Sequence, residues 1–142
     1  MKAFNPYLNF SGNTEEAFNF YKSVFGGEFA LVMRFRDIPG NENIPEEFQD
    51  KIMHIALPVG NGNMLMATDS LEYLGQKLIQ GNNHYFMLSA DSKEEADDLY
   101  AKLSVNGIVE MSLQDTSWGD YYGSFTDQFG IQWMIDYEYP KA

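Results

Sequence analysis

The sequence predicts an α+β fold made of two βαβββ modules, whose strands form a curved mixed sheet around a cleft. One observation is a helix-like pattern that occurs twice: Glu15, Glu16, Ala17 and Tyr21 recur in the same spacing as Glu94, Glu95, Ala96 and Tyr100. Another is the order of segments, because one strand-like stretch precedes each helix and three follow it. With 142 residues, 44% of them hydrophobic, the chain is also long enough to bury a core.

The first module is predicted to occupy residues 1–69. Its helix begins after Asn13, which with Glu16 resembles a capping box, and ends at Gly26 and Gly27. The expected strands are PYLNF (6–10), EFALVMRFR (28–36), KIMHIALPV (51–59) and NMLMATD (63–69). Two prolines and mixed charges predict an irregular loop over 37–50.

A linker over residues 70–83 leads to the second module, residues 84–142, within a single domain of 1–142. The Ser92–Glu95 spacing is a capping box that starts the second helix, and Gly107 is expected to end it. The expected strands are HYFMLSA (84–90), IVEMSLQD (108–115), YYGSFTD (121–127) and IQWMIDYEY (131–139). One such module has a sheet with two apolar faces and a single helix to cover one of them, so two modules are expected to share the remaining faces.

Charge and composition exclude several classes of function. The net charge is −12 with only nine Lys and Arg residues, whereas a nucleic-acid binder needs a basic surface, so we expect no nucleic-acid partner. No apolar run approaches the roughly 20 residues of a membrane span, and we expect no membrane partner. The start of the chain lacks a signal-peptide pattern, so a cytoplasmic location is expected. The absence of cysteine rules out disulfides and thiolate ligands.

Order and spacing of these segments resemble the vicinal oxygen chelate superfamily, which includes glyoxalase I, extradiol dioxygenases and bleomycin-resistance proteins. The resemblance is strongest to the PhnB-like subgroup. It is carried by YLNFSGNTEEAFNFYKSVFGGE (7–28), HIALPVGNGNMLMATD (54–69) and WGDYYGSFTDQFGIQWMI (118–135). The last motif keeps the subgroup's frame, although Tyr121, Gln128 and Ile131 depart from it. The resemblance implies the glyoxalase/bleomycin resistance fold.

The resemblance also implies where a metal ion would sit in metal-dependent members, which use His, Glu or Gln ligands. Carried onto this sequence, those positions are Asn5, Met66, Tyr85 and Met134. Thioethers prefer soft ions, and none of the four side chains supplies a carboxylate or an imidazole. We therefore expect no metal ion at these positions and no cofactor.

Strand alternation and the resemblance together predict a set of side chains that line the cleft. Methionine suits irregular apolar ligands, but in strands it also commonly fills the core, and both interpretations stay open here. His54 is either a core residue satisfied by a neighbour or a group that hydrogen bonds to a ligand or acts as a base. The predicted cleft-lining residues are Tyr7, Asn9, His54, Met64, Met66, Tyr85, Met87, Gln132 and Met134.

These observations predict a metal-free PhnB-like protein that binds an unidentified small apolar or amphipathic molecule. Whether it is an enzyme is left open. One alternative is a metal-dependent glyoxalase- or dioxygenase-type enzyme, and another is a bleomycin-type drug-sequestering resistance protein. No G-x-G-x-x-G motif supports a dinucleotide or S-adenosylmethionine site. Aromatic residues in SLEYLGQKL (70–78) and IDYEYP (135–140) add to the resemblance in favouring a homodimer.

Overall fold

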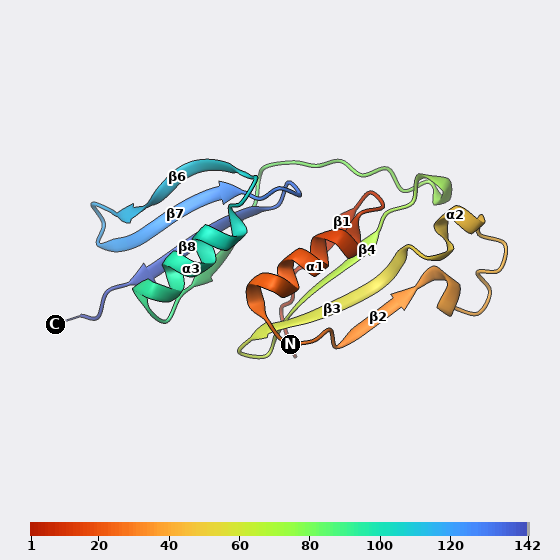
Figure 1. The fold of residues 1–142 in the computed structure, drawn as a ribbon, viewed down its shortest axis with the longest axis horizontal. Coiled ribbons are helices and arrows are strands. Elements are labelled where there is room, and N and C mark those ends of the chain that lie inside the picture. Colours follow the sequence, from red (N-terminus) through yellow and green to blue (C-terminus); the bar gives the residue numbers. More distant parts are fainter. Residues whose placement is uncertain (142) are drawn as a thin grey trace. The chain divides into compact units, whose positions relative to one another are not determined.

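The computed structural model describes residues 1–141 and divides the chain into two compact units, Met1–Ile79 (unit 1) and Gln80–Ala142 (unit 2). Each unit contains one four-stranded sheet with one long helix packed against it (Figure 1). None of the helices within 1–141 is long and apolar enough to cross a membrane. The module boundaries inferred from the sequence stay a prediction.

Unit 1 carries its helix on one face of a mixed sheet with the order β1-β4-β3-β2. Strand β1 runs parallel to β4, and the other neighbouring strands are antiparallel. The helix buries Ala17, Phe18 and Tyr21 completely, which is the apolar stripe that the sequence spacing predicts. The elements are β1 (Tyr7–Phe10), α1 (Thr14–Phe25), β2 (Leu31–Arg34), a 3₁₀ turn η1 (Phe35–Asp37), α2 (Glu46–Gln49), β3 (Ile52–Gly60), β4 (Asn63–Asp69) and η2 (Glu72–Leu74).

Unit 2 repeats this arrangement with the order β5-β8-β7-β6, again with the first and last strands parallel. Its elements are β5 (Phe86–Ser89), α3 (Lys93–Leu103), β6 (Ile108–Asp115), β7 (Asp120–Thr126) and β8 (Gln132–Glu138). Because both units have the same strand order and a helix after the first strand, the prediction of two βαβββ modules is confirmed.

The start of α1 differs from the sequence-based prediction. The Asn13 side chain makes no capping hydrogen bond. Instead, the backbone N–H of Thr14 donates to Oδ1 of Asp69 over 3.0 Å, and the N–H of Ile52 donates to Oδ2 over 2.8 Å. A buried carboxylate at the end of β4 therefore ties the first turn of the helix to the sheet, which replaces the local cap. The capping prediction for Asn13 is wrong because a tertiary contact takes its place.

The helix α3 begins as predicted but ends earlier than predicted. Oγ of Ser92 accepts a hydrogen bond from the N–H of Glu95 over 3.0 Å, as a capping box requires. The helix stops at Leu103, and Asn106 adopts the left-handed conformation, so Gly107 is not the residue that ends it. Gly107 is needed for space, because a Cβ there would lie 2.2 Å from the backbone oxygen of Thr126.

Gly107→Ala is expected to destabilise the chain by about 2 kcal/mol, since the added methyl group meets backbone that cannot rotate away. The matched control is Gly81→Ala, because a Cβ at Gly81 has no neighbour within 4 Å. Urea unfolding of both variants measures the difference. Equal unfolding midpoints for the two variants would show that the backbone of β7 shifts to accommodate the methyl group without loss of stability.

The segment over residues 37–50 is more ordered than its prolines suggest. A single helical turn, α2, follows Pro45, a residue that suits the start of a helix. The Gln49 side chain donates to the carbonyls of Asn41 and Ile44 over 3.0 and 2.6 Å. These contacts close the loop on itself, so the expectation of wholly irregular structure is wrong for residues 46–49.

Candidate functional site

The face of the unit 1 sheet opposite α1 is only partly covered, and we call it the open face of unit 1. Alternation along β4 separates the two faces, because Leu65 and Ala67 are buried while Met64 and Met66 are half-buried. Strand register places Tyr7 beside Met66 on this face. The predicted residues of unit 1 that lie here are Tyr7, Asn9, His54, Met64 and Met66.

Tyr7 and His54 form a pair on the open face of unit 1. The Tyr7 hydroxyl lies 3.0 Å from Nδ1 of His54, and the two rings stack with centroids 5.5 Å apart. Partial burial raises the pKa of Tyr7 above its ordinary value, so the hydroxyl is protonated at neutral pH. No other group within residues 1–141 hydrogen bonds to the His54 ring. Nε2 of His54 therefore has no hydrogen-bond partner among residues 1–141.

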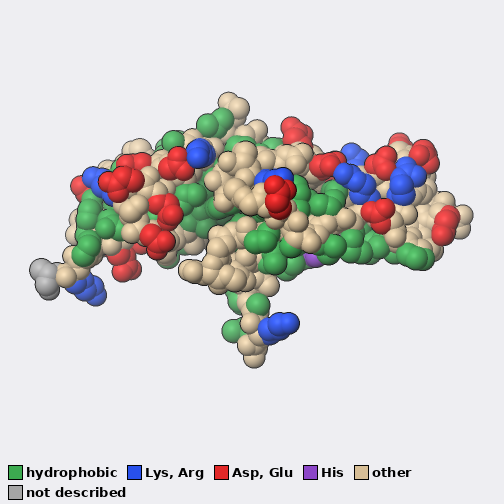
Figure 2. Space-filling view, turned by 60° about the horizontal axis from the view of Figure 1, so that its bottom comes forward, with side chains coloured by type: hydrophobic (Ala, Val, Ile, Leu, Met, Phe, Trp, Pro, Cys, Tyr) green, Lys and Arg blue, Asp and Glu red, His purple; other side chains and the backbone are tan. Residues whose placement is uncertain are grey.

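The surroundings of this pair are apolar and accessible. Tyr7 keeps 45% of its surface exposed and Leu31, opposite Ala56 on β3, keeps 41%. Figure 2 shows hydrophobic side chains gathered along the lower right edge of the view, with few charged side chains among them. One hydrogen-bonding pair in an apolar surrounding is the composition of many small-molecule sites.

The corresponding face of the unit 2 sheet is more polar. The Tyr85 hydroxyl donates to Oε2 of Glu110 over 2.6 Å, and this carboxylate raises the pKa of Tyr85. Met87 lies beside Met134 in the sheet, and Gln132 is buried two residues before Met134. The structure thus places all four predicted residues of unit 2 on or next to one sheet face.

The donors at the family's metal positions do not suit a hard or borderline divalent ion. Register sets Tyr7, rather than Asn5, beside Met66, and Met87, rather than Tyr85, beside Met134. Oδ1 of Asn5 is engaged by the backbone N–H of Met64 over 3.0 Å. Thioethers and neutral phenols supply no charge to compensate such an ion, so the residues present do not fit the family's metal.

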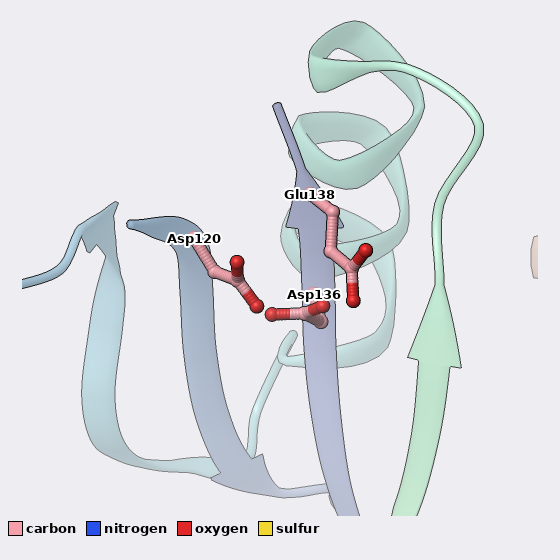
Figure 3. A group of neighbouring side chains, drawn as sticks. All are labelled: Asp120, Asp136 and Glu138. Atoms are coloured by element: carbon pink, nitrogen blue, oxygen red, sulfur yellow. The ribbon is translucent and has the colours of Figure 1, made fainter. Parts of the chain in front are cut away.

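Three carboxylates that sequence analysis did not group meet at one end of the unit 2 sheet. Asp120 begins β7, while Asp136 and Glu138 follow each other on the same face of β8, and Figure 3 shows the three side chains converging. Their closest oxygens all lie within 4.8 Å of one another. Burial of Asp136, followed by the nearby Asp120 and Glu138 carboxyls, raises the pKa of Asp136 from 3.8 to about 6.

Asp136→Asn is expected to stabilise the chain at pH 8 by about 1 to 3 kcal/mol. The raised pKa means that the folded chain binds this proton more tightly than the unfolded chain, so stability is lost as pH rises from about 4 through about 6. The substitution should therefore have little effect at pH 4 and its full effect at pH 8, measured by urea unfolding. An equal gain at both pH values would contradict a charge-based origin.

A buried carboxylate also organises the turn between β7 and β8. Oδ1 of Asp127 accepts from the N–H groups of Phe129 and Ile131, and Oδ2 accepts from Nε1 of Trp133 over 2.8 Å. Asp127 is 3% exposed, so it is structural rather than part of a site. The sequence alone predicts a turn at Asp127. The hydrogen bond from the Trp133 indole could not be predicted, because it forms only when β8 folds back beside the turn.

A small cavity of about 220 Å³ lies in unit 1 near the start of α1. Several of its polar groups are already paired within the protein. Lys51 donates to the Gly12 carbonyl over 2.8 Å, and Glu15 pairs with Arg34 over 2.6 Å. The residues that line it are Gly12, Glu15, Glu47, Asp50, Lys51, Ile52 and Asp69. The open face of unit 1 is the better candidate, because it has an unused hydrogen-bonding atom.

Two βαβββ modules, each with one four-stranded mixed sheet and one long helix, are the architecture of the glyoxalase/bleomycin resistance fold. The chain belongs to the Glyoxalase/Bleomycin resistance protein/Dioxygenase superfamily, whose sequence model matches residues 3–135.

Three relatives bear this out in sequence and structure. Protein PA1353 from Pseudomonas aeruginosa is 37% identical, with a TM-score of 0.84 over 97% of this chain and 98% of that one. A PhnB protein from Bacillus cereus is 26% identical, with a TM-score of 0.77 over 96% of this chain and 99% of that one. Protein YjdN of Escherichia coli K12 is 29% identical over 93% of this chain and 92% of its own length. The resemblance to the PhnB-like subgroup is thereby confirmed.

Proposed function

We propose that this chain is a PhnB-like protein that binds a small apolar or amphipathic molecule on the open face of unit 1, without a metal ion at the family's metal positions. The observation that carries the proposal is the Tyr7–His54 pair, which sits among partly exposed apolar side chains and leaves Nε2 of His54 without a partner. The inclusion of Tyr85, Met87, Gln132 and Met134 in the same site stays a prediction.

The pair favours a ligand with a hydrogen-bond acceptor. If the protonated Tyr7 hydroxyl donates to Nδ1, neutral His54 carries its proton on Nε2. The ring then presents one donor to the open face, next to the adaptable thioether of Met66. A molecule with a carbonyl or ether oxygen on an apolar body satisfies both features.

Enzymatic activity of the glyoxalase or dioxygenase type has less support, because that chemistry depends on a metal ion and the donors at the family positions do not fit one. The family relationship alone does not supply an activity. A drug-sequestering role would use the same open face, and no feature of the described residues favours a particular drug. A homodimeric assembly and a cytoplasmic location also stay predictions.

His54→Ala is expected to weaken binding of the apolar probe 8-anilinonaphthalene-1-sulfonate about tenfold, which corresponds to the loss of one hydrogen bond to a ligand group. The probe carries a sulfonate acceptor on an apolar body, and fluorescence titration of the full chain measures its affinity. The melting temperature should change by only a few degrees, because the ring is partly exposed.

Tyr7→Phe is the matched control that tests whether the orientation of the His54 imidazole matters for binding. It removes the hydroxyl that holds the imidazole and keeps the apolar ring, so an intermediate affinity is expected. Unchanged probe affinity in both variants would refute the proposal, and so would a large loss of stability in His54→Ala, which would mark the histidine as a core residue.

A further inference from the structure

The open face of unit 1 is polar at one end of its strands. His54 lies there on β3 and Thr68 on β4, and register places Asn9 of β1 beside Thr68. The hydroxyl of Ser70 donates to Oδ1 of Asn9 over 3.4 Å. The hydrogen-bonding side chains of this face therefore gather at the end of the sheet where His54 lies.

Toward the hairpin between β3 and β4 the same face becomes apolar. Ala56 follows His54 on this face of β3, and its partners on the two neighbouring strands are larger apolar residues. Pro58 comes next along β3 and pairs with Met64. None of these side chains carries a charge or a hydrogen-bond donor. We call the set the apolar strip, and its members are Leu31, Ala56, Pro58, Met64 and Met66.

The dimensions of the apolar strip suit an extended chain. Strand residues advance by about 3.3 Å, so the path from His54 to Pro58 covers about 13 Å. Leu31 and Met66 lie on the strands at either side of Ala56, and those strands are about 10 Å apart. Ala56 is only 5% exposed, so its flexible neighbours cover it and must rotate aside to admit a ligand. The strip is thus long and has the width of one hydrocarbon chain.

We propose that the ligand of the open face of unit 1 is a linear amphiphile, with a hydrogen-bond acceptor at one end and an unbranched hydrocarbon chain of about ten carbons. The acceptor binds Nε2 of His54, and the chain lies along the apolar strip toward Pro58. This inference rests on the proposed function, because both use the same histidine, and it adds the shape and the chemical class of the ligand.

The proposed geometry makes affinity depend on chain length. Each methylene group that leaves water for an apolar surface adds a roughly constant increment to the free energy of binding. Affinity should therefore grow by a constant factor with every carbon that lies on the strip, and the growth should stop once the chain extends past Pro58 into solvent.

Competition with 8-anilinonaphthalene-1-sulfonate tests this dependence on the full chain. The competitors are sodium hexanoate, octanoate, decanoate and dodecanoate, each below its micellar concentration. We expect the affinity to rise about two- to fourfold per methylene up to decanoate, with little further gain for dodecanoate. The branched isomer of octanoate, 2-propylpentanoate, should bind at least about threefold more weakly than octanoate, because it covers less of the strip.

Met64→Gln separates the two ends of the site. It places an amide at the far end of the strip, so the affinity for decanoate should fall at least about threefold. Hexanoate does not reach Met64 and should bind as before. The matched control is Met111→Gln, because Met111 is also partly exposed but lies on β6 of unit 2. An equal effect of Met64→Gln on hexanoate and decanoate would overturn the proposed orientation of the chain.

His54→Ala distinguishes failure of the linear ligand from failure of the proposed function. If this variant weakens every carboxylate but affinity does not increase with chain length, the site stands and the linear ligand is wrong. The same conclusion follows if 2-propylpentanoate binds as tightly as octanoate. If His54→Ala leaves every affinity unchanged, the proposed function fails, and the linear ligand fails with it.

Discussion

Asp127→Ala is expected to lower the free energy of unfolding by about 4 kcal/mol, a large part of the stability of a domain of this size. Three N–H groups, from Phe129, Ile131 and the Trp133 indole, donate to this one carboxylate. Alanine removes the acceptor that these three N–H groups share, and Trp133 is among the most deeply buried side chains. Urea unfolding followed by tryptophan fluorescence measures the loss.

The control for this prediction is Asp98→Ala. Asp98 is exposed on α3, where it forms a surface ion pair with Lys102 over 3.0 Å, so its removal should cost less than about 0.5 kcal/mol. A loss below about 1 kcal/mol for Asp127→Ala would mean that water replaces the carboxylate in the turn and that the hairpin is held by other contacts.

Met66→Asp is expected to abolish measurable binding of 8-anilinonaphthalene-1-sulfonate, with an affinity loss of at least a hundredfold. The substitution places a carboxylate beside Tyr7 on the open face of unit 1, where an apolar ligand would have to bury it and where it repels the sulfonate. Met66 is half-buried, so the chain should still fold.

Val105→Asp provides the matched control, because it also converts an exposed apolar side chain to a carboxylate but lies in the turn after α3. Its probe affinity should equal that of the unsubstituted chain. A similar loss in both variants would show that the probe responds to overall charge and does not report the open face of unit 1.

The order of helices and strands was predictable because the local sequence signals assign each segment the same element that burial of its apolar residues requires. The repeated Glu-Glu-Ala pattern marks both helices, and Ser92 caps α3 as its spacing indicates. Alternation along β4 was sufficient to place Met64 and Met66 on one face. Because successive side chains of a strand point to opposite faces, burial of one face under α1 decides which side chains lie on the other face.

Contacts between distant segments were not predictable in the same way. Asp69 replaces Asn13 at the start of α1 only because β4 ends beside that turn. The meeting of the Asp120, Asp136 and Glu138 carboxyls depends on the pairing of Asp120 with Glu138, which is a property of strand register and has no signature in either strand alone.

Native mass spectrometry of the full chain, mixed with 8-anilinonaphthalene-1-sulfonate, tests the central claim most directly, because it reports bound probe and retained metal in one spectrum. It also counts the subunits and so checks the predicted dimer. Binding to the open face of unit 1 without a metal at the family positions predicts one probe molecule per chain and no added transition metal. One Fe, Ni or Zn ion per chain, retained with no probe bound, would contradict it.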